Sequence, residues 1–222
     1  MDILESMKRR HSVRQYRDLP LAEPIVSALR GELEAINREA GLHFQLVTGE
    51  PRAFGGRMAH YGKFEGAVNY VVIAGKKCEG FSEKCGYFGE RFVMFAHGLG
   101  LHTCWVALTY KRVPGVCTLD EGEKYSLVIA LGHGRNRGLP RKSKTAEQVS
   151  NASEASPEWF RRGVAGALTA PTAMNQQKFK LTLLPSGKVR ASAGLGFYTK
   201  TDLGIVKYHF ELAAGVGREI WA

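Results

Sequence analysis

The chain has 222 residues, a formal net charge of +10 at pH 7 and 44% hydrophobic residues. This length suits one domain or two tightly fused halves. A chain this long can bury a hydrophobic core that is stable without disulfides or a bound metal. A balance of 44% hydrophobic against 23% charged residues is ordinary for a globular protein and argues against disorder. No apolar run approaches the roughly 18 residues that a membrane-spanning helix needs.

The cysteines and the first residues bear on the cellular compartment. The N-terminal residues up to Glu5 are acidic and amphipathic, unlike a secretory signal. The cysteines are scattered without a CxxC pair, which disfavours a zinc site or a redox dithiol. We therefore expect a cytoplasmic protein with reduced thiols at Cys78, Cys85, Cys104 and Cys117.

The positive charge is concentrated in three stretches, 8–10, 135–144 and 161–162. Such a surplus favours anionic partners, either nucleic acid, an acidic membrane or a phosphorylated small molecule. None of the stretches interleaves aromatic with basic residues, as an RNA-binding sheet would. The alternatives are a phosphate site where two clusters converge, or solvated faces that keep the protein soluble.

Three helices are predicted in the first hundred residues. Residues 2–9 form a short helix, and 22–40 form a longer one with Pro24 in its first turn and Gly41 as its stop. A third covers about 86–99, where apolar side chains recur at steps of four, three and four residues.

Short apolar runs predict strands, and the C-terminal third of the chain forms a smaller module. Helices and strands alternate throughout, which predicts a mixed α/β or α+β fold with a sheet covered by helices. We divide the chain into a larger half, 1–150, and a smaller half, 151–222, with the best linker candidate at 145–157. The predicted strands are 44–46, 68–74, 103–108, 125–131, 179–183 and 188–192, and the last two helices cover about 157–168 and from Thr201 or Asp202 to Gly215.

Two motifs combine positive charge with small residues. Segment 10–14, Arg-His-Ser-Val-Arg, carries guanidinium groups that match phosphate oxygens and a hydroxyl that adds a neutral donor. Segment 132–144 places glycines after a buried strand and then cations, which could complete a phosphate pocket. For each, the alternative is a solvated basic turn or loop.

Two further motifs suit a flat, uncharged ring. Segment 98–105 has glycines between a helix and a strand, where the backbone can approach a ligand. Segment 170–177 offers Thr172, Asn175 and Gln177 as neutral hydrogen-bonding groups. The alternatives are a helix C-cap followed by a core tryptophan, and an ordinary proline-containing loop. We find no nucleophile–base set and no metal-binding motif. An enzyme without its own acid–base machinery would need a cofactor to carry its reaction.

These four segments, in order, resemble the FMN-dependent nitroreductase family. Segment 10–14 resembles the family's N-terminal arginine–serine–arginine phosphate motif, and 90–105 resembles its helix followed by glycine-leucine-glycine-threonine-x-tryptophan. Segment 128–132 resembles the strand ending in leucine–glycine, and 170–177 resembles the alanine–proline–serine–x–x–asparagine–x–glutamine motif. The resemblance covers most of the chain and points to a compact branch in which two unequal halves of one chain mimic the usual dimer.

The resemblance implies a fold, a cofactor and a reaction. The fold would be nitroreductase-like α+β, with a central, mainly antiparallel sheet flanked by helices and one FMN between the halves. NADH or NADPH would reduce the flavin, and a small-molecule acceptor such as a nitroaromatic or a quinone would then take the electrons in a ping-pong mechanism. The flavin would carry the chemistry, with no metal and no assigned catalytic side chain. We expect no nucleic-acid or membrane partner, and a monomer (pseudo-dimer) or a homodimer.

Roles carry over from the family by position. The phosphate and ribityl chain would be bound by Arg10, Ser12 and Arg14, with His11 in the same motif and Arg141 or Lys144 assisting. The isoalloxazine ring would face Thr172, Asn175 and Gln177 on one side, and Leu101, His102 and Thr103 from the other half.

The chain departs from the family pattern in three places. Its Ala-Pro motif lies in the C-terminal third, His102 replaces the second family glycine, and Lys178-Phe179 replaces a proline–tryptophan pair. The last two changes keep open a flavin-binding storage or sensing protein without turnover. The charge keeps open a basic nucleic-acid-binding protein, although charge alone selects poorly among anionic partners.

Overall fold

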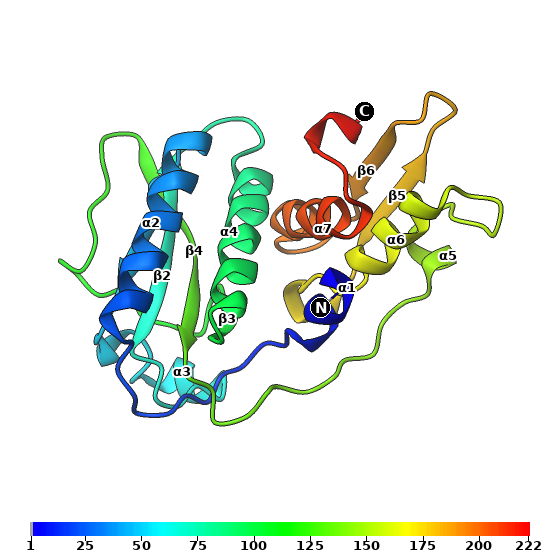
Figure 1. The fold of residues 1–222 in the computed structure, drawn as a ribbon. Helices are drawn as coiled ribbons and strands as arrows, with labels where there is room; N and C mark the ends of the chain where they lie inside the picture. The colour runs from blue at the N-terminus through cyan, green and yellow to red at the C-terminus, as the bar shows by residue number, and fades with distance from the viewer. Residues whose placement is uncertain (1) are drawn as a thin grey trace. The chain divides into compact units, whose positions relative to one another are not determined.

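The structure is a computed structural model, and it describes residues 2–222 (Figure 1). The predicted larger half also includes residue 1, which lies outside the described residues. The helices are α1 (Ile3–Arg9), α2 (Glu23–Ala40), α3 (Arg57–Tyr61), α4 (Phe81–Gly98), α5 (Ala146–Val149), α6 (Glu158–Ala167) and α7 (Thr199–Ala214), and the strands are β1 (Gln45–Val47), β2 (Asn69–Lys76), β3 (His102–Val106), β4 (Glu123–Gly132), β5 (Phe179–Leu183) and β6 (Val189–Ala193).

The chain divides into two compact units. The sheet unit comprises Arg10–Phe81 and Arg91–Leu139, and the helical unit comprises the residues up to Arg9 with Ser82–Glu90 and Pro140–Ala222. Helix α4 therefore contributes residues to both units. The predicted halves, 1–150 and 151–222, stay a prediction.

The sheet unit contains a four-stranded antiparallel sheet in the order β1-β2-β4-β3. Its two central strands carry the continuous apolar runs of the sequence, and they are buried along most of their length. In the register of these strands Val71 pairs with Ile129, and Cys104 of β3 pairs with Ala130. Burial of both faces explains why β2 lacks the alternating pattern of a half-exposed strand.

Helix α2 is amphipathic and lies beside the sheet in Figure 1. It ends at Gly41, whose backbone is left-handed, with φ of 58°, and whose N–H donates to the Asn37 carbonyl. Glycine adopts this conformation without a side-chain clash, so the helix stops where the sequence predicts. Its buried side chains, spaced to lie on one face, are Val26, Leu29, Leu33 and Ile36.

The helical unit is built on the close packing of α6 and α7, with the antiparallel hairpin β5–β6 in the same unit. Two glycines of α6 make this approach possible. A Cβ atom at Gly163 would lie 2.4 Å from Phe210 Cε2, and one at Gly166 would lie 2.3 Å from Ala213 Cβ. Both distances are far below van der Waals contact, so only glycine fits these positions.

The predicted fold class is confirmed, a mixed fold with an antiparallel sheet flanked by helices. Three details differ. Helix α4 begins at Phe81 rather than near residue 86. The sequence does not show this start, because the helix is buried on most of its sides and lacks a single apolar stripe. Part of the predicted linker forms α5, which begins with a capping box between Thr145 and Gln148. The short helix α3 was not predicted. Within residues 2–222, no helix is long and apolar enough to cross a membrane.

Candidate functional site

The N-terminal arginine–serine motif lies along the start of β3 in the sheet unit. Val13 N–H donates to the Thr103 carbonyl over 3.0 Å, and Ser12 forms an isolated parallel bridge with Thr103. Segments 10–14 and 98–105, far apart in the chain, are therefore side by side. This contact places Leu101, His102 and Thr103 next to the segment that contains Arg10, His11, Ser12 and Arg14.

The glycine-rich loop after β4 closes against the same place. Gly134 N–H donates to His102 Nδ1 over 3.2 Å. Gly138 has φ of 77°, and a Cβ atom there would lie 2.5 Å from His11 Cβ. The start of segment 132–144 thus packs against segments 10–14 and 98–105, and glycine is needed at Gly138 for both its conformation and its close approach.

The electrostatics of this cluster are positive. Partial burial lowers the pKa of His102, and the charges of His133, Arg137 and Arg17 lower it further. His102 is therefore a neutral imidazole at neutral pH. Since its Nδ1 accepts from Gly134, its proton is on Nε2. A field that disfavours an added positive charge favours a bound anion.

The thiol of Cys104 lies on the inner side of this cluster. Burial raises its pKa, while the charge of Arg14 and a hydrogen bond from Ser12 act in the opposite direction. The thiol donates to the Trp105 carbonyl over 3.5 Å. Cys104 is thus a protonated, buried thiol rather than a nucleophile.

The remaining predicted residues gather in the helical unit, where segment 140–144 runs beside loop 168–177. The Arg141 guanidinium donates to the Ala170 carbonyl over 2.7 Å. Lys144 Nζ donates to the Gln177 carbonyl over 2.7 Å, and Asn175 Nδ2 donates to the Lys142 carbonyl over 2.7 Å. The structure therefore brings Arg141, Lys144, Thr172, Asn175 and Gln177 together within one unit.

Gln177 is the centre of this second group and is only 2% exposed. Its Oε1 accepts from Lys144 N–H over 2.8 Å, and its Nε2 donates to Ser143 Oγ over 3.1 Å. Its own backbone N–H donates to Thr172 Oγ1 over 3.0 Å. The side chain of Gln177 therefore holds the two segments together, a contribution that its place in the motif does not reveal.

One functional candidate lies outside the sequence motifs. Asp202, in the first turn of α7, accepts hydrogen bonds from Ala173 N–H and from the Gln176 side chain. The sequence predicts a helix start near this residue but contains no signal that it contacts loop 172–177. Only the tertiary packing of α7 shows the contact.

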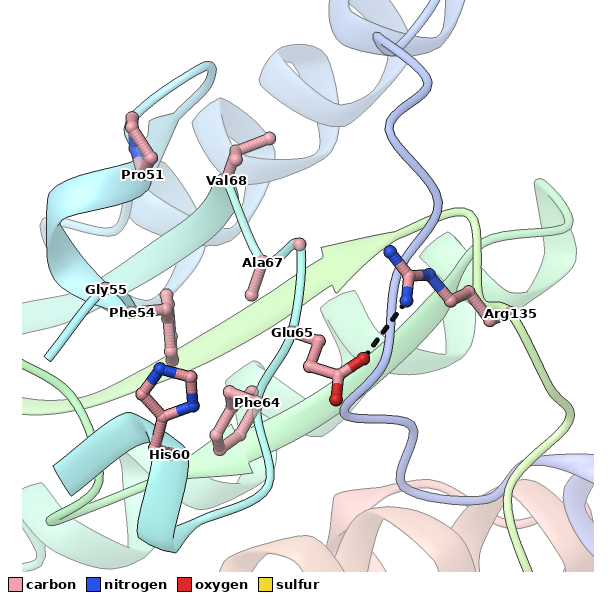
Figure 2. A pocket seen from close by; sticks show the side chains of 10 residues that line it. Pro51, Phe54, Gly55, His60, Phe64, Glu65, Ala67, Val68 and Arg135 are labelled. Atoms are coloured by element: carbon pink, nitrogen blue, oxygen red, sulfur yellow. Dashed lines mark hydrogen bonds and ion pairs between the residues drawn. The ribbon is translucent and has the colours of Figure 1, made fainter. Parts of the chain in front are cut away.

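A cavity of about 360 Å³ opens on the sheet unit (Figure 2). Its lining residue Glu65 donates its backbone N–H to the Arg14 carbonyl over 3.0 Å. Phe54 and Phe64, with ring centroids 4.9 Å apart, form its apolar wall. An ion pair of 3.0 Å between Arg135 and Glu65 forms its rim, and His60 lies beside the aromatic rings. None of the twelve predicted cofactor residues lines this cavity.

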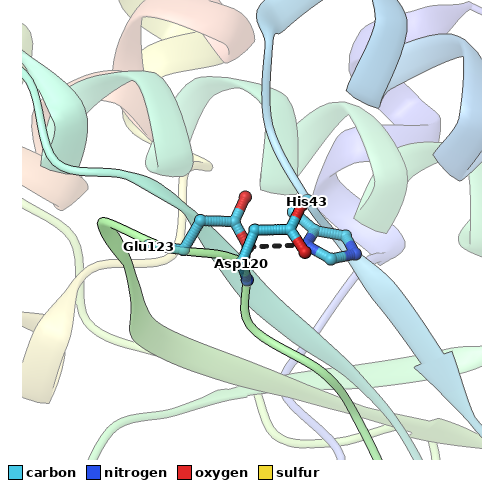
Figure 3. A group of neighbouring side chains, drawn as sticks. All are labelled: His43, Asp120 and Glu123. Carbon is cyan, nitrogen blue, oxygen red and sulfur yellow. Dashed lines mark hydrogen bonds and ion pairs between the residues drawn. The ribbon is translucent and has the colours of Figure 1, made fainter.

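A group of metal-type ligands occurs elsewhere in the sheet unit (Figure 3). The ligand atoms of His43, Asp120 and Glu123 lie within 4.8 Å of one another. His43 Nδ1 is 2.6 Å from Glu123 Oε2, which also accepts from Asp120 N–H over 2.8 Å. Two ligands of one tetrahedral zinc ion at bonds of about 2.1 Å would lie roughly 3.4 Å apart. The contact is therefore a hydrogen bond that ties the start of β4 to the segment before β1.

A comparison with protein families decides which family this chain belongs to. Residues 2–214 match the family model described as "Putative TM nitroreductase". The chain belongs to this nitroreductase family. The resemblance inferred from the four motifs is thereby confirmed. No curated protein is significantly similar to this nitroreductase in sequence.

Solved structures show that the nitroreductase fold extends to distant proteins. A "putative nitroreductase" from Thermotoga maritima has a TM-score of 0.64 and 21% identity, covering 96% of this chain and 83% of its own. A second, from Desulfovibrio desulfuricans and in complex with FMN, has a TM-score of 0.54 and 20% identity, covering 70% of this chain and 98% of its own. A "putative NADH dehydrogenase/NAD(P)H nitroreductase" from Parabacteroides distasonis has a TM-score of 0.51 and 20% identity, covering 66% and 95%.

Proposed function

We propose that this nitroreductase is an FMN-dependent NAD(P)H oxidoreductase that passes electrons to nitroaromatic compounds, quinones or similar electron-poor acceptors. The observation that carries the proposal is the pairing of segment 10–14 with the start of β3 inside a positively charged cluster. Membership of the family supports it, and so does the FMN complex of the Desulfovibrio protein.

The chemistry of the donor set fits a phosphate monoester. Arg10 and Arg14 supply guanidinium groups, which bind phosphate oxygens in a forked geometry, and Ser12 supplies a neutral donor. Burial is the main cause of the lowered pKa of His102, and the nearby charges of His133, Arg137 and Arg17 lower it further. These charges disfavour an added positive charge at this place. A dianion is stabilised in such a field, so Arg10, Ser12 and Arg14 would hold the FMN phosphate and the ribityl chain.

The helical unit supplies the other part of the proposed binding set. Thr172 and Asn175 would contact the uncharged ring with neutral donors and acceptors, which suit its carbonyl and N–H groups. Gln177, which is buried and bonded to Lys144 and Ser143, would support the loop from beneath. Hydrogen bonds to segment 140–144, and one within the loop between Gln177 and Thr172, keep the loop in one shape before a ligand arrives. Preorganised polar groups of this kind lower the cost of binding. Arg141 and Lys144 would assist from the same segment.

When bound, FMN supplies the hydride and electron transfer, and the proposed ping-pong mechanism alternates NAD(P)H and acceptor. The chain's own residues bind and orient the cofactor and stabilise negative charge on it. Cys104 takes no part as a nucleophile, because its thiol is buried and protonated.

Anaerobic mixing of the FMN-loaded protein with NADPH, followed by addition of a quinone, tests the proposal. We expect prompt loss of the flavin absorbance and its return when the quinone is added. Bound flavin that NADH and NADPH both fail to reduce would instead support a storage or sensing protein. Duplex DNA affinity that falls steeply with salt, in a protein that rejects FMN, would support the nucleic-acid alternative.

A further inference from the structure

We propose that Asp202 is a positioning residue that holds loop 172–177 in the shape that receives the flavin ring. The link to the flavin rests on the proposed function, whereas the anchoring of the loop stands on the geometry of the helical unit alone.

The carboxylate of Asp202 reaches both ends of a short loop. Oδ1 accepts from Ala173 N–H over 2.9 Å, and Oδ2 accepts from Gln176 Nε2 over 2.7 Å. Asp202 is 5% exposed, so these bonds are largely sheltered from water. Both oxygens thus have donors from the same loop, one near its start and one near its end.

The loop needs such an anchor because its backbone is unusual. Met174, Asn175 and Gln177 have φ values of 51°, 54° and 44°, in the left-handed region that favours glycine. Side chains with a Cβ atom adopt this region at a cost in conformational free energy, and it persists only where surrounding contacts impose it. Met174 is 99% exposed, so packing of its own side chain does not impose it.

Gln176 extends the anchor to a second loop. Its Nε2 donates to Asp202 Oδ2 and also to the Phe197 carbonyl over 2.9 Å. An amide nitrogen has two hydrogens, and both partners here are acceptors, so the orientation of the amide is fixed. One carboxylate therefore orders loop 172–177 together with the segment around Phe197.

Keeping a carboxylate at this position has a cost. Burial raises the pKa of Asp202 to about 6, although the hydrogen bonds from Ala173 and Gln176 lower it. The donors that meet the carboxylate are neutral, and neutral donors compensate a buried charge only in part. A buried aspartate that meets only neutral donors adds little to the stability of the fold. Its role is therefore to position the loop.

The test compares Asp202→Asn with the exposed, matched control Glu158→Gln, in the first turn of α6. Asparagine keeps the size and can still accept from Ala173 N–H, but its own amide nitrogen would face the amide nitrogen of Gln176. We expect faster amide hydrogen exchange in 172–177 and 194–198, with the melting temperature unchanged or raised. We expect Glu158→Gln to change neither.

Flavin binding gives the second measurement. For Asp202→Asn we expect the dissociation constants of FMN and of riboflavin, which has no phosphate, to rise by a similar factor of about ten. Unchanged exchange in both segments would overturn the proposal, as would faster exchange with unchanged affinity for both flavins.

If the wild-type protein binds no flavin, the proposed function fails, and the exchange experiment still decides the anchoring. If Asp202→Asn does not fold, Gln176→Ala gives the same test at a half-buried position.

Discussion

His209 Nε2 lies 2.8 Å from Glu90 Oε1, and both side chains are completely buried in the helical unit. Thr169 Oγ1 lies 2.7 Å from the Gly166 carbonyl, to which it donates its hydrogen. Thr169 must therefore accept from His209 Nδ1, 2.9 Å away. Because Nδ1 carries a hydrogen, His209 and Glu90 share the remaining proton, either as an ion pair or as a neutral pair.

Removal of Glu90 tests how much this pair contributes to the free energy of unfolding. We expect Glu90→Ala to lower the free energy of unfolding by about 3–5 kcal/mol, because it leaves a buried imidazole without its carboxylate partner. Urea denaturation measures this. The control is Glu5→Ala, which removes an exposed carboxylate 2.7 Å from Lys8 and should cost at most about 1 kcal/mol. Equal losses in the two variants would show that burial adds nothing to the Glu90 pair.

The two glycines Gly166 and Gly31 should respond to alanine in opposite directions. At Gly166 the new methyl group would meet Ala213 Cβ at 2.3 Å, so we expect Gly166→Ala to destabilise the fold by about 1–3 kcal/mol or more. At Gly31, on the exposed side of α2, no atom lies within 4 Å of the added Cβ. There, Gly31→Ala should stabilise the fold by about 0.5–1 kcal/mol, because alanine is the better helix former. Thermal unfolding of both variants measures these changes in stability. An unchanged melting temperature for Gly166→Ala would contradict the packing of α6 on α7.

The stability of the fold should respond to the titration of Asp202. Its pKa is raised by burial from 3.8 to about 6, so the folded protein holds a proton that the unfolded chain has lost between these values. This contribution to the free energy of unfolding is fully present below about pH 4, and it is lost as the pH rises through about 6. The free energy of unfolding of the wild type should therefore gain about 2–3 kcal/mol relative to Asp202→Asn between pH 7.5 and about pH 4. Denaturant titrations over this range measure the difference, and a pH-independent difference would contradict the burial of an ionised Asp202.

Arg14 provides the sharpest test of the phosphate end of the proposed site. We expect Arg14→Ala to weaken FMN binding by about 1.5–3 kcal/mol, because a charge-assisted hydrogen bond to phosphate is lost. Riboflavin affinity should change little, in contrast to the expectation for Asp202→Asn. The charge-matched control is Arg30→Ala on the exposed side of α2. Fluorescence titration gives all of these dissociation constants, and equal effects at Arg14 and Arg30 would assign the loss to general charge.

Local signals in the sequence predict much of the fold. Helix α2 is predicted almost to the residue, because an amphipathic repeat leads to Gly41. The start of α4 at Phe81 is missed, because a helix buried on most sides has no clear apolar stripe to mark its beginning. Helix α5 is missed because its four residues lie in a polar stretch where only the capping box signals a helix.

The candidate site is predictable only as separate motifs. The sequence identifies segment 10–14 and loop 170–177 from their residue types, yet nothing local shows that Val13 pairs with Thr103. Asp202 is missed because its contact with Ala173 depends on how α7 packs, which no local pattern encodes. The internal bonds of Gln177 are likewise a product of tertiary structure.

The central claim is that this nitroreductase binds FMN through the arginine–serine motif beside β3. The absorption spectrum of the purified protein, before and after addition of FMN and removal of the excess, tests it most directly. The account predicts a yellow protein with the visible absorption bands of an oxidised flavin, and about one FMN per chain. A colourless protein that retains no added FMN would contradict it.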